Sequence, residues 1–144
     1  MSRRWPRQDD GSAALETVIL APPMLAIIAM AIIGMRIEVA GGAIEGAAHA
    51  AARAASIAGN PQAAQSAAFA TANASLQQQG LKCAQLQVMV NTAEFARPPG
   101  QQANVYVDIT CVVALADVAA PGMPGSKSMN ATFVSPIDVY RSRS

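Results

Sequence analysis

The feature that most restricts the fold of this 144-residue chain is an apolar run over residues 12–35 that contains one ionisable side chain, Glu16. As a helix, this run would be roughly 36 Å long at about 1.5 Å per residue, enough to cross a hydrocarbon core of about 30 Å. We therefore predict a transmembrane segment over residues 12–35. A carboxylate within hydrocarbon costs at least about 2.5 kcal/mol, so Glu16 is expected to have a function and a partner.

Basic residues flank the apolar run unequally. Arg3, Arg4 and Arg7 precede it, whereas only Arg36 follows it closely. Because loops rich in Lys and Arg stay on the cytoplasmic side, the N-terminus is predicted to be cytoplasmic. Residues 36–144 are then predicted to form an extracytoplasmic domain of a single-pass protein of the cell membrane.

A cleaved secretory signal is the alternative to a membrane anchor. Residues 2–5 weakly resemble a twin-arginine signal. Against a cleaved signal, the apolar run is long, Asp9 and Asp10 interrupt the approach to it, and no clear small-x-small cleavage site ends it before Arg36.

The start of the apolar run resembles a known family. Gly11 is followed by Ser12 and, four residues later, by Glu16, within the sequence G-S-A-A-L-E-T. A short basic leader that ends in Gly, followed by an apolar helix with Glu at its fifth position, resembles the N-termini of type IV pilins. With its Pro-interrupted apolar run and small extracytoplasmic domain, the chain resembles the TadE-like proteins of Flp (Tad) pilus systems. Thr17 stands where the related pseudopilins often have Tyr.

This resemblance implies that residues 1–11 are a cytoplasmic leader, which a prepilin peptidase removes by cleavage between Gly11 and Ser12. It also implies that Glu16 pairs with the freed α-amine of Ser12 on a neighbouring subunit, which would lower the cost of both charges in lipid. The alternative is that Glu16, one turn into the segment, extends toward the headgroups and water.

The function implied by the resemblance is non-catalytic and structural: a minor pilin or pseudopilin that acts in assembly, and in one version initiation, of a Flp/Tad pilus. The implied partners are other pilin or pseudopilin subunits, the prepilin peptidase, the pilus membrane platform and the lipid bilayer. Whether the chain is a filament subunit, a tip initiator or an assembly factor retained in the membrane stays open. The competing function is a secreted or membrane-anchored extracytoplasmic binding module with no filament.

The first helix is expected to kink or restart at Pro22-Pro23, because proline removes backbone donors and disfavours helical geometry before it. Beyond Arg36 it is expected to continue out of the membrane as an amphipathic helix. The apolar stripe, made mostly of Ala, would pack on the domain's own sheet, on another subunit, or on both. Gly42-x-x-x-Gly46 would add a second surface of close approach. The predicted polar face comprises Glu38, Glu45, His49, Arg53 and Ser56, and the apolar face comprises Ile37, Ala40, Ile44, Ala47, Ala51, Ala55 and Ala58.

Gly59-Asn60-Pro61 is predicted to end the first helix and to open a second one over residues 61–79, which Gly80 closes. Alternation of apolar and polar residues then predicts strands over residues 86–91, 105–113 and 129–139, with Pro136 restricting the last one to an edge or a bend. Phe133 and Val139 share the inward parity of the third strand. The predicted fold class is α+β, with a three-stranded antiparallel meander packed on two helices.

Cys83 and Cys111 are the only cysteines, and they fall in the segment predicted to be extracytoplasmic, where disulfides persist. We expect them to be paired. In the chain-entropy model, the loop of roughly 29 residues that they close would stabilise the domain by about 3 kcal/mol.

Composition and motifs argue against several other functions. The net charge is +1 and 13% of residues are charged, so no basic field favours nucleic acid. The sequence has one His and contains no H-E-x-x-H, Walker or G-x-S-x-G motif. We therefore expect no enzyme activity, no catalytic residue, no metal site and no cofactor.

Overall fold

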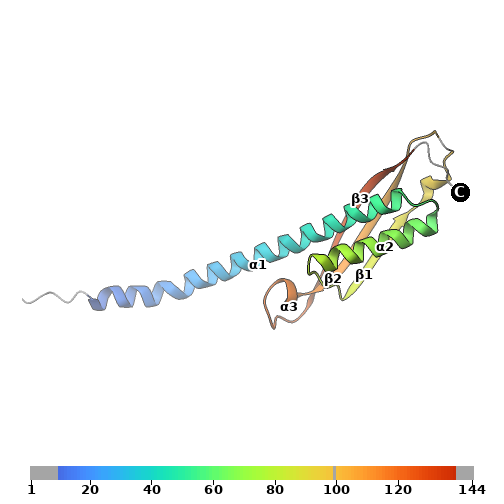
Figure 1. Cartoon of the computed structure of the whole chain (residues 1–144). Helices are drawn as coiled ribbons and strands as arrows, with labels where there is room; N and C mark the ends of the chain where they lie inside the picture. The colour runs from blue at the N-terminus through green and yellow to red at the C-terminus, as the bar shows by residue number, and fades with distance from the viewer. Residues whose placement is uncertain (1–9, 99, 139–144) are drawn as a thin grey trace, which may run out of the picture.

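The computed structural model describes residues 10–98 and 100–138. A long helix, α1 (Asp10–Ser56), is followed by α2 (Pro61–Gln78) and the strands β1 (Gln85–Asn91), β2 (Ala103–Ala114) and β3 (Ser126–Ile137). Two short helices, η1 (Ala93–Ala96) and α3 (Leu115–Val118), lie in the connections between strands. The second half of α1 and all of α2 lie side by side against the sheet, while the first half of α1 extends away from it (Figure 1). The predicted α+β fold is confirmed.

The sheet is a meander in the order β1-β2-β3, with both pairs antiparallel. Its inner face is formed mainly by the central strand, and α1 packs over β2 and β3 while α2 packs over β1. The five inward side chains of β2 that are fully buried are Val105, Val107, Ile109, Cys111 and Val113. The predicted alternation of β1 and β2 is confirmed, with each strand slightly longer than expected.

Alanine forms most of the contact between the two helices. The residues that are fully buried there are Ala47, Ala51 and Ala55 on α1 and Ala64, Ala68 and Ala72 on α2. Because a methyl group is short, the helices can approach each other closely. Each helix is stabilised mainly by its packing against the other helix and the sheet. The apolar stripe of α1 thus packs on the domain's own core. This is one of the two partners expected for it from the sequence; the other was another subunit.

The junction between the helices follows the predicted signals. Asn60 is the N-cap of α2, and its side-chain oxygen accepts a hydrogen bond from the backbone N–H of Ala63 at 2.8 Å. Pro61 occupies the first helical position, where its missing N–H costs no helical hydrogen bond. After α2, Gly80 has φ = 71°, which only glycine adopts without strain.

Of the two outcomes expected at Pro22-Pro23, a kink or a restart of the helix, the restart does not occur. α1 passes through both prolines as one helix (Figure 1). Two backbone hydrogen bonds are lost there, but ending the helix would leave about four N–H and four C=O groups without partners at the break. In an apolar segment without water, those unpaired groups cost more than the local distortion caused by the prolines.

Ser56 departs from its predicted face, whereas Phe133 lies on its predicted face, opposite Val107, but is more exposed than expected. Ser56, expected on the polar face of α1, is only 6% exposed; its hydroxyl donates to the carbonyl of Arg53 and accepts a hydrogen bond from the Ser135 hydroxyl at 3.1 Å. Phe133, expected to be buried, is 38% exposed because β3 is an edge strand. Its ring lies edge-to-face against His49, with 4.4 Å between the ring centroids. Val139 lies outside the described residues.

We predict that enlarging the close helix contact destabilises the domain. Ala68→Leu adds three carbon atoms where the side chain is fully buried, so the free energy of unfolding should fall by roughly 1–3 kcal/mol. Ala70→Leu, at an exposed position of the same helix, is the matched control and should change stability little. Thermal unfolding of the full chain in detergent measures both. Equal melting temperatures for the two variants would contradict the close Ala packing.

Candidate functional site

The residues singled out from the sequence lie at the far end of α1 from the domain. The helix begins at Asp10, so Gly11 and Ser12 belong to its first turn. Backbone N–H groups in a first turn have no helical partner, and helix ends fray. The Gly11–Ser12 peptide bond therefore lies in a turn of α1 whose unfolding breaks few helical hydrogen bonds.

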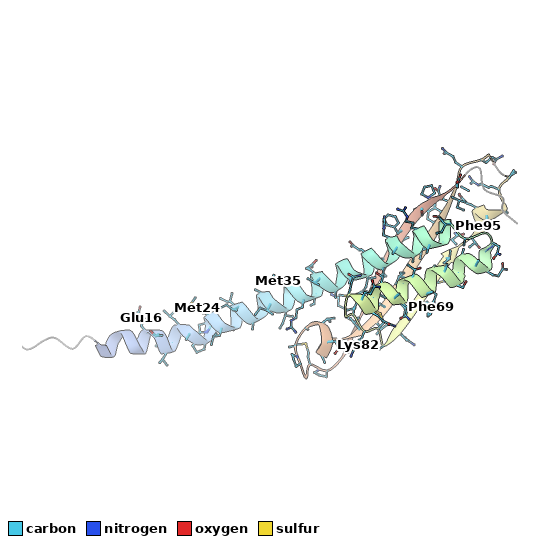
Figure 2. The ribbon with its side chains drawn as sticks, in the orientation of Figure 1. Glu16, Met24, Met35, Phe69, Lys82 and Phe95 are labelled. Atoms are coloured by element: carbon cyan, nitrogen blue, oxygen red, sulfur yellow. A yellow bond between two sulfur atoms is a disulfide. The ribbon has the colours of Figure 1, made fainter. Side chains whose placement is uncertain are left out.

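Glu16 is exposed and lies in the section of α1 that extends away from the domain (Figure 2). No salt bridge involves it within residues 10–98 and 100–138. From Glu16 onward, the first buried residue of α1 is Ala40, and the 24 residue steps between them span roughly 36 Å at about 1.5 Å per residue. The folded domain therefore supplies no counter-charge, and a partner for Glu16 has to come from another molecule, from water or from the N-terminus.

Beyond Glu16, the helix is apolar on every side. Successive residues Val18, Ile19 and Leu20 are all exposed, and so are most of the large apolar side chains that follow them as far as Val39, with Ile33 and Ile37 half-buried. Within Glu16–Ser56, an 18-residue window has a mean hydropathy of 2.4 and no buried residue, and the helix is long and apolar enough to span a membrane. A helix that is hydrophobic all round requires an apolar environment on all sides, which lipid or neighbouring helices provide.

The predicted disulfide is confirmed. Cys83 and Cys111 are bonded, with their Cα atoms 5.4 Å apart. Cys111 is fully buried in the central strand, whereas Cys83 lies in the connection between α2 and β1. The bond therefore fastens the helical layer to the middle of the sheet.

A side chain that the sequence analysis missed protects the edge of the sheet. The Gln65 amide on α2 donates to the carbonyl of Val88 at 2.7 Å and accepts from the N–H of Val90 at 3.1 Å. It occupies two backbone positions of β1 that another strand could otherwise pair with. A Gln on a helix surface carries no local signal of this role, because the contact joins residues far apart in the chain.

In the part of the chain that the structure describes, no group of three or more His, Cys, Asp or Glu side chains is placed to hold a metal ion. His49, the only histidine, lies on the exposed side of α1 against Phe133. Comparisons with protein-family models, with curated proteins and with solved structures found no match to this chain.

We predict that breaking the disulfide destabilises the fold without changing it. Cys83→Ser removes the cross-link while keeping a side chain of similar size at a half-buried position. The free energy of unfolding should fall by about 3 kcal/mol in the chain-entropy model. Thermal unfolding of the full chain in detergent measures this loss, and wild-type protein treated with a reductant should lose a similar amount. Two alkylatable thiols in untreated protein from the cell envelope would contradict the pairing.

Proposed function

We propose that this chain is a TadE-like minor pilin or pseudopilin that acts in the assembly of a Flp/Tad pilus. In this proposal it is held in the cell membrane with its N-terminus in the cytoplasm and its domain outside. Its role is structural rather than catalytic. The observation that carries the proposal is Glu16, which is the one ionisable side chain of residues 12–35 and has no salt-bridge partner among the described residues.

The continuity of α1 supports this role. The same helix is apolar and largely exposed up to Met35 and contributes to the core of the domain from Ala40 onward. A subunit built this way could leave the bilayer only if other helices covered its exposed half, because that surface is not stable in water. In a filament, neighbouring copies of such helices would form this cover, and the Ser12 amine of one subunit could reach the Glu16 carboxylate of the next.

Glycines on the exposed part of α1 leave room for such packing. A side chain added at Gly34, Gly41 or Gly42 would meet no described heavy atom within 4 Å. Gly42 and Gly46, the predicted close-approach pair, are both exposed; the space beside Gly42 is open, whereas the Gln79 amide lies 3.8 Å from a side chain added at Gly46. A helix from another subunit could therefore approach the backbone of α1 along this side.

The disulfide supports the proposed orientation. Disulfides form and persist outside the cytoplasm, and the Cys83–Cys111 bond lies in the domain that follows the span. This placement agrees with the orientation expected from the Arg residues before the apolar run.

We predict that Gly11→Val blocks removal of the leader. A peptidase that cuts at this bond needs close access to the backbone, and a branched side chain at Gly11 obstructs it. Full-length protein should accumulate in the membrane, whereas Gly34→Val, at an open position of the span, should be processed normally. Mass spectrometry of the mature N-terminus measures both.

The same measurement separates the proposal from its competitors. Processing as proposed gives Ser12 as the first residue of the wild-type protein. A first residue beyond Arg36 would indicate a cleaved secretory signal, and Met1 or Ser2 would indicate an uncleaved anchor; either result would contradict processing as a prepilin.

We predict that Glu16→Gln separates insertion from assembly. The amide keeps the shape of the side chain but removes its charge, so the Ser12 amine of a neighbour would be left unpaired in lipid at a cost of a few kcal/mol. The variant should still be cleaved and still fractionate with membrane, yet fail to co-purify with pilin partners or to support pili. Glu38→Gln, the same change on the same helix beyond the span, is the matched control. Normal piliation by Glu16→Gln at matched protein levels would reduce Glu16 to a tolerated interfacial charge.

A further inference from the structure

A groove of about 450 Å³ lies where α1 meets the domain, beside the point at which the helix leaves its predicted span. One wall is α1, with Ile32, Met35 and Val39. The opposite wall is formed by Leu81, just after α2, and by Val118 of α3. The segment that carries α3 lies at the end of the domain nearest to the exposed half of α1 (Figure 1), and Lys82 lies at the same end (Figure 2).

This groove is continuous with the surface that α1 presents to lipid. Ile32 and Met35 line the groove and also belong to the predicted span over residues 12–35. Val39, one turn further on, is 72% exposed although it is apolar. Hydrocarbon that contacts Ile32 can therefore extend along α1 to Val39 beside the Arg36 side chain, and it would cover apolar side chains that water otherwise contacts.

Two opposite charges line the same groove. Arg36 lies on the α1 wall and Asp117 on the α3 wall. Within the described ranges, neither side chain forms a salt bridge with the other or with any other residue. A ligand for this groove therefore needs an apolar body, a negative group for Arg36 and a positive group for Asp117.

We propose that the groove binds a zwitterionic aminophospholipid of the surrounding bilayer. One acyl chain lies between α1 and the Leu81 and Val118 side chains, the phosphate contacts the Arg36 guanidinium, and the headgroup ammonium contacts the Asp117 carboxylate. A guanidinium matches the geometry of phosphate oxygens well. A second copy of this chain is the less favoured occupant, because the α1 surface of a neighbour would bring no charge pair to Arg36 and Asp117 from its apolar span. The proposal requires α1 to cross a membrane and is independent of pilus assembly.

The test uses the full chain in phosphatidylethanolamine nanodiscs that contain a trace of phosphatidylethanolamine with a photoactivatable diazirine near the carboxyl end of one acyl chain. Adducts are mapped by mass spectrometry after illumination. We expect adducts on residues beyond the span, at Val39, Leu81 or Val118. Arg36→Gln should lower the yield of these adducts by about fivefold, whereas Arg53→Gln, at an exposed position further along α1, should leave it unchanged.

A second pair of variants tests the apolar wall. Val39→Asn should lower the yield by about fivefold, because it places a polar amide against the acyl chain, whereas Ile57→Asn should have no effect. Ile57 is 66% exposed at the end of the same helix and is distant from the groove. Retention of the disulfide and of helical circular dichroism shows that each variant is folded.

The charge pair is tested with a second probe. Asp117→Asn should remove the preference for phosphatidylethanolamine over an anionic phosphatidylglycerol probe with the same diazirine chain. An adventitious annular lipid would label only residues N-terminal to Arg36 and would be insensitive to all three groove variants, which would overturn the proposal. Absence of lipid adducts at Val39, Leu81 and Val118 in the wild-type chain would also overturn it, and release of the protein from membranes by alkaline carbonate would contradict the span itself.

Discussion

The whole structure depends on one helix that meets two different environments. α1 is apolar and largely exposed as far as Met35 and is buried along one face from Ala40 onward. An α-helix satisfies its own backbone hydrogen bonds, so it can pass from lipid into a protein core without leaving polar groups unpaired. The buried half of α1 is a major part of the core of the domain.

The parts of the fold that local chemistry determines were predictable. Asn60 and Pro61 specify the start of α2 through one side-chain acceptor and one missing donor, and the alternation in β2 specifies which side chains are buried. The features that were missed depend on contacts between distant residues. Gln65 reaches a strand that begins 20 positions later in the chain, and Ser56 is buried only because Ser135 pairs with it. The restart that was one of two expected outcomes at Pro22-Pro23 does not occur, because the cost of ending a helix in an apolar environment exceeds the local preference of the prolines.

The two candidate sites also differ in whether neighbouring residues or distant segments of the chain form them. The arrangement of Gly11, Ser12 and Glu16 is contained in six consecutive residues, so it could be recognised in the sequence. The groove at the base of the domain joins three segments, from α1, the end of α2 and α3, and no local pattern places Arg36 opposite Asp117. Both proposed sites concern the membrane: one would place a charge at or within the hydrocarbon region, and the other would extend the apolar surface of the predicted span up to the folded domain. The disulfide and the Ala contacts hold the domain rigidly at that boundary.

The central claim, that α1 is one helix divided between lipid and core, is tested most directly by scanning spin labels along residues 18–57 of the full chain in bilayers. Accessibility to oxygen and to a water-soluble nickel complex is measured at each position. The account predicts high oxygen accessibility and low nickel accessibility at every position up to about residue 35, without periodicity. Beyond Arg36 it predicts nickel accessibility with a period of about 3.6 residues, lowest at Ala47, Ala51 and Ala55. A helical period throughout residues 18–35, or nickel accessibility within them, would contradict the division of α1.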